Sequence, residues 1–506
     1  MIKRTYSVVL LSFIVFFTTS VLAAKHSSLF SEFTIDSPLT LTHNVMIADV
    51  SPIPGKELIT LGVDKDNQSW LIIYKQMMNR QGFEVLDQIM LDKSISRFDI
   101  SEYKKGQQQK IFFMNHNQAM LYHPPSDAGK GSIKTLGNIQ SLFLDENPQF
   151  IAKSDFLVEL DNNGDSHILS HHFNGVNIYR VDESFSQQTQ LNIKPQIAME
   201  NDAAEFTKRK LYVFDINFDN KQDVITVGDG ELIAHVQNNE NNGFSIHKIK
   251  LNDSISGVNW WDKRDASGDS LDQTNLVYRS LEEIRDVNGD GMIDLVVKYT
   301  QSLGVLDRVN NFEVFFGKNR NGKLTFDDKA NTVVTGEGTL TGLRLLDINN
   351  DNKLEVVLSG FDIGISQIIG ALMSGSIDQD VYLYQLDNQL AFSENADVEK
   401  EVELNFSISS GQSGNPVVEL LDVNGDGLKD FLLSSGEKTL KVYLGQNGKR
   451  LFSKRSQRYK TQLPKDGNFF EVNDINNDGK DDIVFKYGRL DGNEKRKQFK
   501  VLISKY

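Results

Sequence analysis

The chain has 506 residues, 39% of them hydrophobic, no cysteine, and a net charge of −15 from 54 basic and 69 acidic residues. The absence of cysteine excludes a disulfide framework and a lipoprotein anchored through a cysteine at the cleavage site. Its acidity argues against nucleic acid or an anionic membrane as a partner, because both require a basic face.

Residues 1–23 have the pattern of a secretory signal peptide. Lys3 and Arg4 precede an apolar run at 8–17, and small residues end the segment at Ala23 and Ala24. The run is shorter than the roughly 20 residues of a membrane-spanning helix. We therefore expect cleavage after Ala23 or Ala24 and a mature chain, 24–506, without a transmembrane segment, in a bacterial periplasm or outside the cell.

An acidic motif recurs along the rest of the chain. Five clear copies read DINFDNKQDVIT, DVNGDGMIDLVV, DINNDNKLEVVL, DVNGDGLKDFLL and DINNDGKDDIVF, starting at Asp215, Asp286, Asp347, Asp422 and Asp474. Weaker copies start at Asp49, Asp99 and Glu159, and the eight starts lie 50 to 75 residues apart. A fixed repeat of this length indicates a solenoid, a propeller or an array.

Each unit has the pattern of four short strands. One strand leads into the acidic loop, and an aliphatic strand leaves it, as in LVVKYT at 295–300. A third strand alternates and contains aromatic residues, as in NNFEVFFG at 310–317. A fourth follows a Gly or Asn turn, as in GFSIHKI at 243–249 and KLTFDD at 323–328. Four antiparallel strands per repeat are typical of a propeller blade.

We therefore predict a single all-β domain, a β-propeller of eight four-stranded antiparallel blades. Seven blades are the alternative, because the unit at Asp99 keeps the least of the motif. The last unit ends after its third strand, so we expect residues 30–44, ahead of the first unit, to supply its fourth strand and close the ring. Closure removes the exposed sheet edges of an open array.

The acidic loops predict about five structural calcium sites. Positions 1, 3, 5 and 9 of each loop carry oxygen ligands, and Gly or Asn at position 6 permits a turn with positive φ. A hard cation with six to eight oxygen ligands fits such a loop better than zinc does. The candidate ligands are Asp215, Asn217, Asp219, Asp223, Asp286, Asn288, Asp290, Asp294, Asp347, Asn349, Asp351, Glu355, Asp422, Asn424, Asp426, Asp430, Asp474, Asn476, Asp478 and Asp482.

The same loops distinguish this motif from an EF-hand. An EF-hand closes with an acid at position 12 and is flanked by helices, whereas here the acid at position 9 runs directly into a strand. The motif resembles the D-x-[DN]-x-D-G-x-x-D-[LIV] loops of the FG-GAP, or VCBS, repeat family, which includes the propeller of integrin α chains. The resemblance covers nearly the whole mature chain, and most clearly the part after about residue 155.

The resemblance implies a β-propeller with calcium in the hairpin loops between the first two strands of each blade. It also implies that those loops stabilise the fold on the face away from the usual binding surface of such propellers. Family propellers often have seven blades. The units at Asp49, Asp99 and Glu159 depart from the pattern, and in the last of these His167 replaces the final acid.

Two insertions and one histidine cluster stand outside the repeat. Trp260, Trp261 and Arg264 suit sugar stacking or a protein contact, although the tryptophans could instead fill the space between blades. Apolar residues at 363–373 recur at helical spacing and predict a helix that caps the ring or docks a partner. His167, His171 and His172 have no matching acid or Cys cluster, so a metal site there is disfavoured.

Two classes of function remain open from the sequence. The first is a secreted, calcium-stabilised, monomeric propeller that binds a protein or glycan through its rim loops and catalyses nothing. The second is a polysaccharide lyase or hydrolase built on a propeller. No G-x-S-x-G, H-E-x-x-H or phosphate-loop motif occurs, and the recognisable motifs are used to build blades, which favours the first class.

Overall fold

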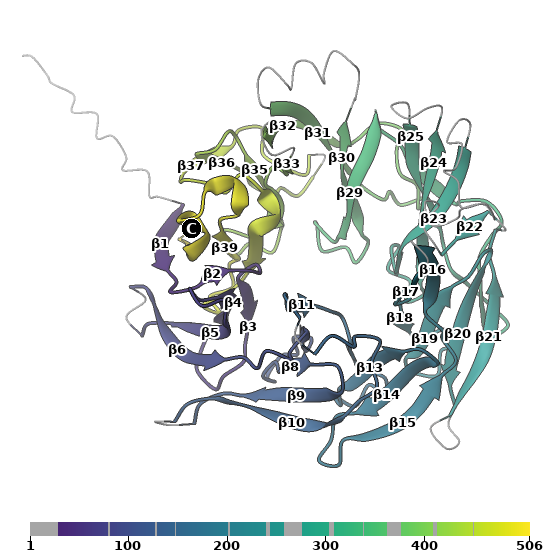
Figure 1. Ribbon diagram of the computed structural model, residues 1–506. Helices are drawn as coiled ribbons and strands as arrows, with labels where there is room; N and C mark the ends of the chain where they lie inside the picture. Colours follow the sequence, from purple (N-terminus) through teal and green to yellow (C-terminus); the bar gives the residue numbers. More distant parts are fainter. Residues whose placement is uncertain are drawn as a thin grey trace, which may run out of the picture.

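The computed structural model describes residues 29–505 except 79–80, 127–128, 147, 201–202, 239–242, 253, 258–275, 303–307, 337, 362–375, 408–411 and 449. The predicted signal peptide, Trp260, Trp261, Arg264 and the apolar stretch 363–373 lie outside the described residues. The described residues form eight small, mainly antiparallel sheets that follow one another around a ring (Figure 1). This confirms the predicted eight-bladed propeller, including a blade at the weak second unit.

The first four blades follow one another in chain order. The first contains β2 (Thr40–Leu41), β3 (Met46–Ala48), β4 (Glu57–Val63), β5 (Ser69–Gln76) and β6 (Phe83–Met90). The second contains β7 (Arg97–Ile100), β8 (Ile111–Met114), β9 (Gln118–His123), β10 (Ser132–Asn138) and β11 (Ala152–Lys153), which runs parallel to β7. The third contains β12 (Leu157–Val158), β13 (His167–His172), β14 (Gly175–Arg180) and β15 (Ser186–Leu191), and the fourth β18 (Tyr212–Phe214), β19 (Asp223–Val227), β20 (Glu231–Gln237) and β21 (Phe244–Lys250).

The last four blades complete the ring. The fifth contains β22 (Ile255–Ser256), β23 (Leu276–Arg285), β24 (Asp294–Ser302), β25 (Arg308–Phe315) and β28 (Thr332–Val334), and the sixth β29 (Thr339–Leu346), β30 (Glu355–Phe361), β31 (Ser376–Tyr384), β32 (Val398–Ser407) and β33 (Gln412–Gly414). The seventh contains β34 (Val418–Leu421), β35 (Asp430–Ser434), β36 (Thr439–Tyr443) and β37 (Gln457–Lys460). The eighth contains β38 (Phe470–Asn473), β39 (Asp482–Lys486), β40 (Gln498–Ser504) and β1 (Phe30–Asp36).

The amino-terminal strand closes the ring, as the sequence predicts. β1 pairs with β40 from Phe30 opposite Ser504 to Asp36 opposite Gln498, and Figure 1 shows the purple β1 beside the yellow carboxy-terminal strands. An ion pair of 2.5 Å between Lys500 and Glu32 reinforces this contact. The two ends of the described chain therefore share one blade. Because β1 pairs with β40, the outer edge of this third strand is not left exposed.

Two hairpins stand apart from the blades. β16 (Gln196–Glu200) pairs only with β17 (Ala203–Thr207), and β26 (Lys318–Arg320) pairs only with β27 (Lys323–Thr325). The second hairpin corrects one prediction: residues 323–328 are not the fourth strand of the fifth blade, which is β28. The turn at Asn321 and Gly322 has positive φ at both residues, so the chain folds back on itself before it reaches the blade edge.

The hydrophobic core consists of eight layers, one between each pair of neighbouring blades. Leu432 of the seventh blade and Phe485 of the eighth share one such layer, and Ile72 of the first blade and Val501 of the eighth share the next. The strands that leave the acidic loops, such as β19, β35 and β39, therefore bury residues on both of their faces, which explains their continuous aliphatic runs. Helical structure among the described residues is limited to the short 3-10 turns η2 (Gly467–Phe469), η3 (Arg489–Asp491) and η4 (Lys495–Lys497). No helix among them could cross a membrane.

Candidate metal loops

Each of the five acidic loops joins the first strand of a blade to its second strand, and all five fold alike. The residues at positions 4 and 6 have φ between +57° and +86°. These residues are Phe218, Asn220, Gly289, Gly291, Asn350, Asn352, Gly425, Gly427, Asn477 and Gly479. Gly and Asn tolerate this backbone best, and Phe218 is the exception. Two left-handed residues in a nine-residue loop turn the side chains at positions 1, 3 and 5 inward.

The hydrogen bonds in the loop of the fifth blade show this inward arrangement. The Asp286 carboxylate, at position 1, accepts hydrogen bonds from the backbone N–H groups of Gly289 and Gly291, both at 2.8 Å. Asn288 Oδ1 accepts from the Asp290 N–H at 3.0 Å, and Asp290 Oδ1 accepts from the Met292 N–H at 2.9 Å. The loops of the fourth, sixth, seventh and eighth blades contain the corresponding hydrogen bond from the N–H at position 6 to the acid at position 1. The candidate ligands at positions 1, 3 and 5 therefore share one small loop.

The position 9 acid has a different environment. Asp223, Asp294, Glu355, Asp430 and Asp482 each begin the second strand of a blade and have no exposed surface. Asp294 Oδ2 accepts from the N–H of Val287, at position 2, at 2.8 Å, while Oδ1 accepts from Gly317, just beyond the third strand, at 2.9 Å. The three other aspartates make the same pair of contacts, to residues 216 and 237, 423 and 445, and 475 and 504. This carboxylate ties the loop to the third strand.

Burial dominates the electrostatics of these position 9 acids. It raises the pKa of Asp294, Glu355 and Asp482 to about 7 and that of Asp223 and Asp430 to about 6. The neighbouring acids of each loop raise the pKa further by charge repulsion. Within the described part of the chain, none of the acids at positions 1, 5 and 9 lies within 4.0 Å of a lysine or arginine nitrogen. Their negative charge therefore has no basic partner there.

This environment fits a hard cation. All candidate donors are oxygens, as calcium prefers, and a cation would compensate the unpaired charge. Among the described residues no three acidic or histidine side chains converge closely enough to form a preassembled metal site. An ion would have to draw the side chains at positions 1, 3, 5 and 9 closer together.

At six of the eight junctions between blades, backbone hydrogen bonds join neighbouring loops into a belt on one face of the ring. At four of these junctions the N–H at position 8 of one loop donates to the carbonyl at position 2 of the preceding loop, at 2.7–3.1 Å. The four bonds join Gln222 to Leu160, Leu354 to Val287, Lys429 to Ile348 and Lys56 to Ile475. Asp481 and Gln109 donate instead to the position 1 carbonyls of Asp422 and Asp49. The belt also crosses the closure between the eighth and first blades. Ordering one loop therefore constrains the adjacent blade.

Two of the weaker copies keep only part of this arrangement. In the first blade, Glu57 occupies position 9, is buried and accepts from the N–H of Val50 at 2.9 Å, although no acid stands at positions 3 and 5. In the second, Asp99 lies inside β7, before the loop at 101–110. Its carboxylate accepts from the N–H groups of Phe156 and Leu157 at 2.8 and 2.9 Å, which ties the second blade to the third.

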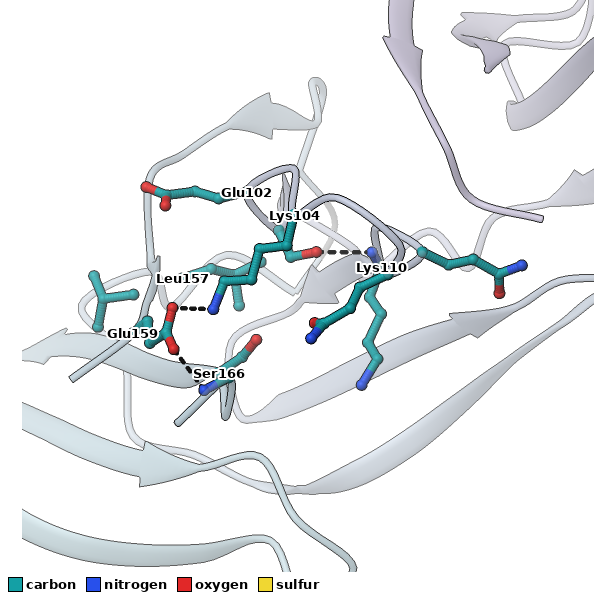
Figure 2. A pocket seen from close by; sticks show the side chains of 11 residues that line it. Glu102, Lys104, Lys110, Leu157, Glu159 and Ser166 are labelled. Atoms are coloured by element: carbon teal, nitrogen blue, oxygen red, sulfur yellow. Dashed lines mark hydrogen bonds and ion pairs between the residues drawn. The ribbon is translucent and has the colours of Figure 1, made fainter. Parts of the chain in front are cut away.

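The third blade's loop, 159–167, folds like the others but is charge-paired within the protein. Asn162 and Gly164 have positive φ at positions 4 and 6, and Glu159 accepts from the N–H of Gly164 at 2.5 Å. The Lys104 ammonium group contacts the other Glu159 oxygen, in a small pocket between the second and third blades (Figure 2). In the weak second copy Lys104 stands at position 6, where the clear copies have Gly or Asn, and the sequence motif did not predict its contact with Glu159.

The three histidines near this loop do not form a metal site. His167 is fully buried, and its Nε2 lies 3.6 Å from an Asp161 oxygen. His171 Nε2 is 3.0 Å from the Arg209 carbonyl oxygen, and His172 Nε2 is 2.9 Å from Gln190 Nε2. Because neighbouring residues of β13 point to opposite faces of the sheet, His171 and His172 diverge.

Comparison with known proteins places the repeat in a family. Residues 422–485, which run from the seventh acidic loop through β39, match the model of the FG-GAP-like repeat. No curated protein matches the chain in sequence.

The chain is also similar to three solved structures. An Agrocybe aegerita lectin that recognises non-reducing terminal N-acetylglucosamine has 14% identity and a TM-score of 0.44, over 84% of this chain and 96% of the lectin. The Vibrio cholerae biofilm matrix protein Bap1 has 11% identity and a TM-score of 0.36, over 96% and 90% of the two chains. A Lactobacillus plantarum protein has 13% identity and a TM-score of 0.35, over 70% and 84%. These similarities are too distant to bear on function. The chain is therefore a β-propeller that contains an FG-GAP-like repeat at residues 422–485.

Proposed function

We propose that the protein is an exported β-propeller that binds a protein or glycan ligand without transforming it, and that calcium in five loops stabilises its ring. The observation that carries the proposal is the charge of those loops. Five loops with the same fold each gather three acids, and within the described residues none of these acids has a basic partner. Clustered carboxylates repel one another unless a cation lies among them.

Calcium suits these loops better than the other common cations. The side chains at positions 1, 3, 5 and 9 would hold it, because they offer only oxygen atoms and form a loop that can adjust. Magnesium demands stricter octahedral geometry, and zinc prefers nitrogen and sulfur ligands. The ion would supply charge compensation and bracing. Through the belt, that bracing reaches the neighbouring blades.

The position of the loops favours a structural role for them and a binding role for the opposite face. The loop side chains are largely occupied by backbone N–H groups within the loop and the blade. The connections from one blade to the next lie at the other ends of the strands, because each loop joins the first strand of a blade to its second. Binding residues concentrate on loops that a rigid scaffold positions.

Calcium and ligand binding can be tested on the same preparation. Equilibrium dialysis should show about five bound calcium ions for the five loops, and a chelator should lower the melting temperature. Arrays of glycans and candidate protein ligands should then give a ligand that is recovered chemically unchanged. A melting temperature that the chelator does not change would rule out structural calcium. Sustained release of sugar products would rule out a purely binding role.

A further inference from the structure

We propose that a pocket between the third and fourth blades binds an acidic sugar residue, with Lys194 and Arg209 holding its carboxylate and His235 and Thr226 contacting its hydroxyl groups. The inference rests on the proposed function for the assumption that the protein binds a ligand. It adds the place of binding and the chemical class of the ligand.

The pocket lies on the face opposite the acidic loops. β19 starts in the fourth loop at Asp223 and reaches the pocket at its far end, through Thr226, Val227 and Gly228. The connection from the third blade to the fourth, which carries the separate hairpin β16–β17, supplies the other wall through Asn192, Lys194 and Arg209. The volume of about 510 Å³ falls within the range of roughly 300–1,000 Å³ usual for small-ligand sites.

Two cations in this pocket are positioned for an anion. Within the described residues neither Lys194 nor Arg209 forms an ion pair, whereas Lys248, on the same blade but outside the pocket, pairs with Glu231 at 2.8 Å. Arg209 Nε donates to the Lys194 carbonyl at 2.9 Å, and the Arg209 carbonyl contacts His171 Nε2 at 3.0 Å. These bonds fix the arginine and leave the terminal N–H groups of its guanidinium to contact a ligand. A guanidinium group recognises a carboxylate through two parallel hydrogen bonds.

The opposite wall offers neutral polar groups. His235 is 3% exposed and lines the pocket, and neither of its ring nitrogens has a hydrogen-bond partner of normal geometry within the described residues. Burial lowers its pKa, so the ring is neutral and carries one donor and one acceptor. Thr226 is 4% exposed and binds the Ile233 carbonyl only weakly, at 3.4 Å. Thr226 and the His235 ring thus have only weak partners within the protein, the Ile233 carbonyl and the Val224 backbone, and a ligand hydroxyl would give them stronger ones.

These groups together fit a uronic acid better than a peptide. One side of the pocket is cationic, the other can exchange hydrogen bonds with hydroxyl groups, and Ile193 and Ile233 provide limited apolar surface between them. Asp229, on the rim, accepts a hydrogen bond from Ser256 at 2.6 Å and adds an oxygen acceptor near the cations. A pyranose ring with one carboxylate and several hydroxyls presents this combination in a compact unit, whereas an acidic peptide side chain has the carboxylate without the hydroxyls.

The test compares a charged ligand with its neutral counterpart. Binding of an oligogalacturonide to the full, calcium-loaded protein is measured by titration calorimetry beside its methyl ester, which keeps the ring and removes the charge. Lys194→Met and Arg209→Met should each weaken binding of the acid roughly tenfold or more, the scale expected for losing a hydrogen bond to a charged group. Lys248→Met removes the same charge outside the pocket and should change nothing. Lys194 donates no hydrogen bond within the described residues, so its variant should keep the melting temperature of the unaltered protein.

The outcomes separate this inference from the proposed function. Selective binding of the acid that Lys194→Met abolishes supports the pocket. Equal binding of acid and ester, or an acid affinity that Lys194→Met and Arg209→Met leave unchanged, overturns it. If a protein or a neutral glycan binds elsewhere and uronates do not bind, the pocket assignment fails while the binding function stands. If nothing on either array binds, the proposed function fails too.

Discussion

The Lys104 ammonium group lies against the Glu159 carboxylate, so a residue of the second blade neutralises the first acid of the third blade's loop. The other two acids of that loop also have partners within the protein. Arg180 binds Asp165 at 2.6 Å, and Asp161 accepts a hydrogen bond from Gln237 Nε2 at 2.8 Å. The five loops with unpaired acids and this one loop with paired acids have the same backbone turn. The protein thus supplies positive charge to the third blade's loop, whereas in the other five the proposed calcium ion would supply it.

The first prediction concerns Lys104. Replacing it with methionine should lower the free energy of unfolding by roughly 1 kcal/mol, as for a partly exposed ion pair, and by the same amount with calcium or with chelator. Urea denaturation in both conditions measures this. Lys105→Met is the control, because the neighbouring lysine is exposed and forms no ion pair within the described residues. A loss confined to the chelated protein would contradict this assignment of charge.

The second prediction concerns the number of bound ions. Asp290→Asn, at position 5 of the fifth loop, should reduce the calcium bound per chain by about one, because a carboxylate ligand becomes a weaker amide ligand. Asp165→Asn, in the paired loop of the third blade, should leave the number unchanged, since its partner is Arg180. Equilibrium dialysis with labelled calcium gives both numbers. Equal losses in the two variants would place an ion in the third loop as well.

The sequence predicts the repeated parts of this molecule because their causes are local. Gly or Asn at the turn positions, acids at fixed spacing and aliphatic strands recur in each clear unit, and each acts within about ten residues. The closing strand was predictable from the missing fourth strand of the last unit. The fourth strand of the fifth blade was not, because the turn at Asn321 and Gly322 makes a local hairpin that competes with pairing at the blade edge.

Contacts between units lay beyond the sequence pattern. Lys104 and Glu159 are 55 residues apart, and the lysine stands in the copy that keeps the least of the motif. Lys194 and Arg209 flank a hairpin insertion that no repeat defines. The double attachment of the four position 9 aspartates was hidden for a similar reason, because their second partner lies at the end of the third strand or just beyond it. The folded ring determines such pairs, and one-dimensional spacing does not.

The third prediction is a pH dependence centred on Asp99. Burial raises the pKa of this carboxyl to about 6, against an ordinary value of 3.8, despite three backbone hydrogen bonds. A raised pKa means that the folded protein holds the proton more tightly than the unfolded chain, so this stabilisation is complete below pH 4 and is lost as the pH rises through 6. At pH 8 the ionised group therefore costs up to roughly 3 kcal/mol relative to pH 4.

Asp99→Asn tests this dependence because asparagine is neutral at every pH and keeps an oxygen for the N–H groups of Phe156 and Leu157. The variant should gain stability relative to the unaltered protein between pH 5 and pH 8, measured as the difference between their urea midpoints at each pH. Other buried acids titrate equally in both proteins and cancel in the difference. A difference that stays constant across this range would refute the assignment.

The fourth prediction tests whether the amino-terminal strand holds the ring closed. Phe30 is 1% exposed, packs edge-on against Tyr459 at 5.1 Å between ring centres, and belongs to the layer between the seventh and eighth blades. Phe30→Ala should therefore cost about 3–5 kcal/mol of stability, the range for truncating a buried phenylalanine. Thr34→Ala, at an exposed position of the same strand, should cost less than about 1 kcal/mol. Hydrogen exchange shows where the variant opens. If β1 holds the ring closed, the amides of β40 should exchange before those of β24 in the fifth blade. Simultaneous exchange of both would mean that β1 adds stability without holding the ring closed.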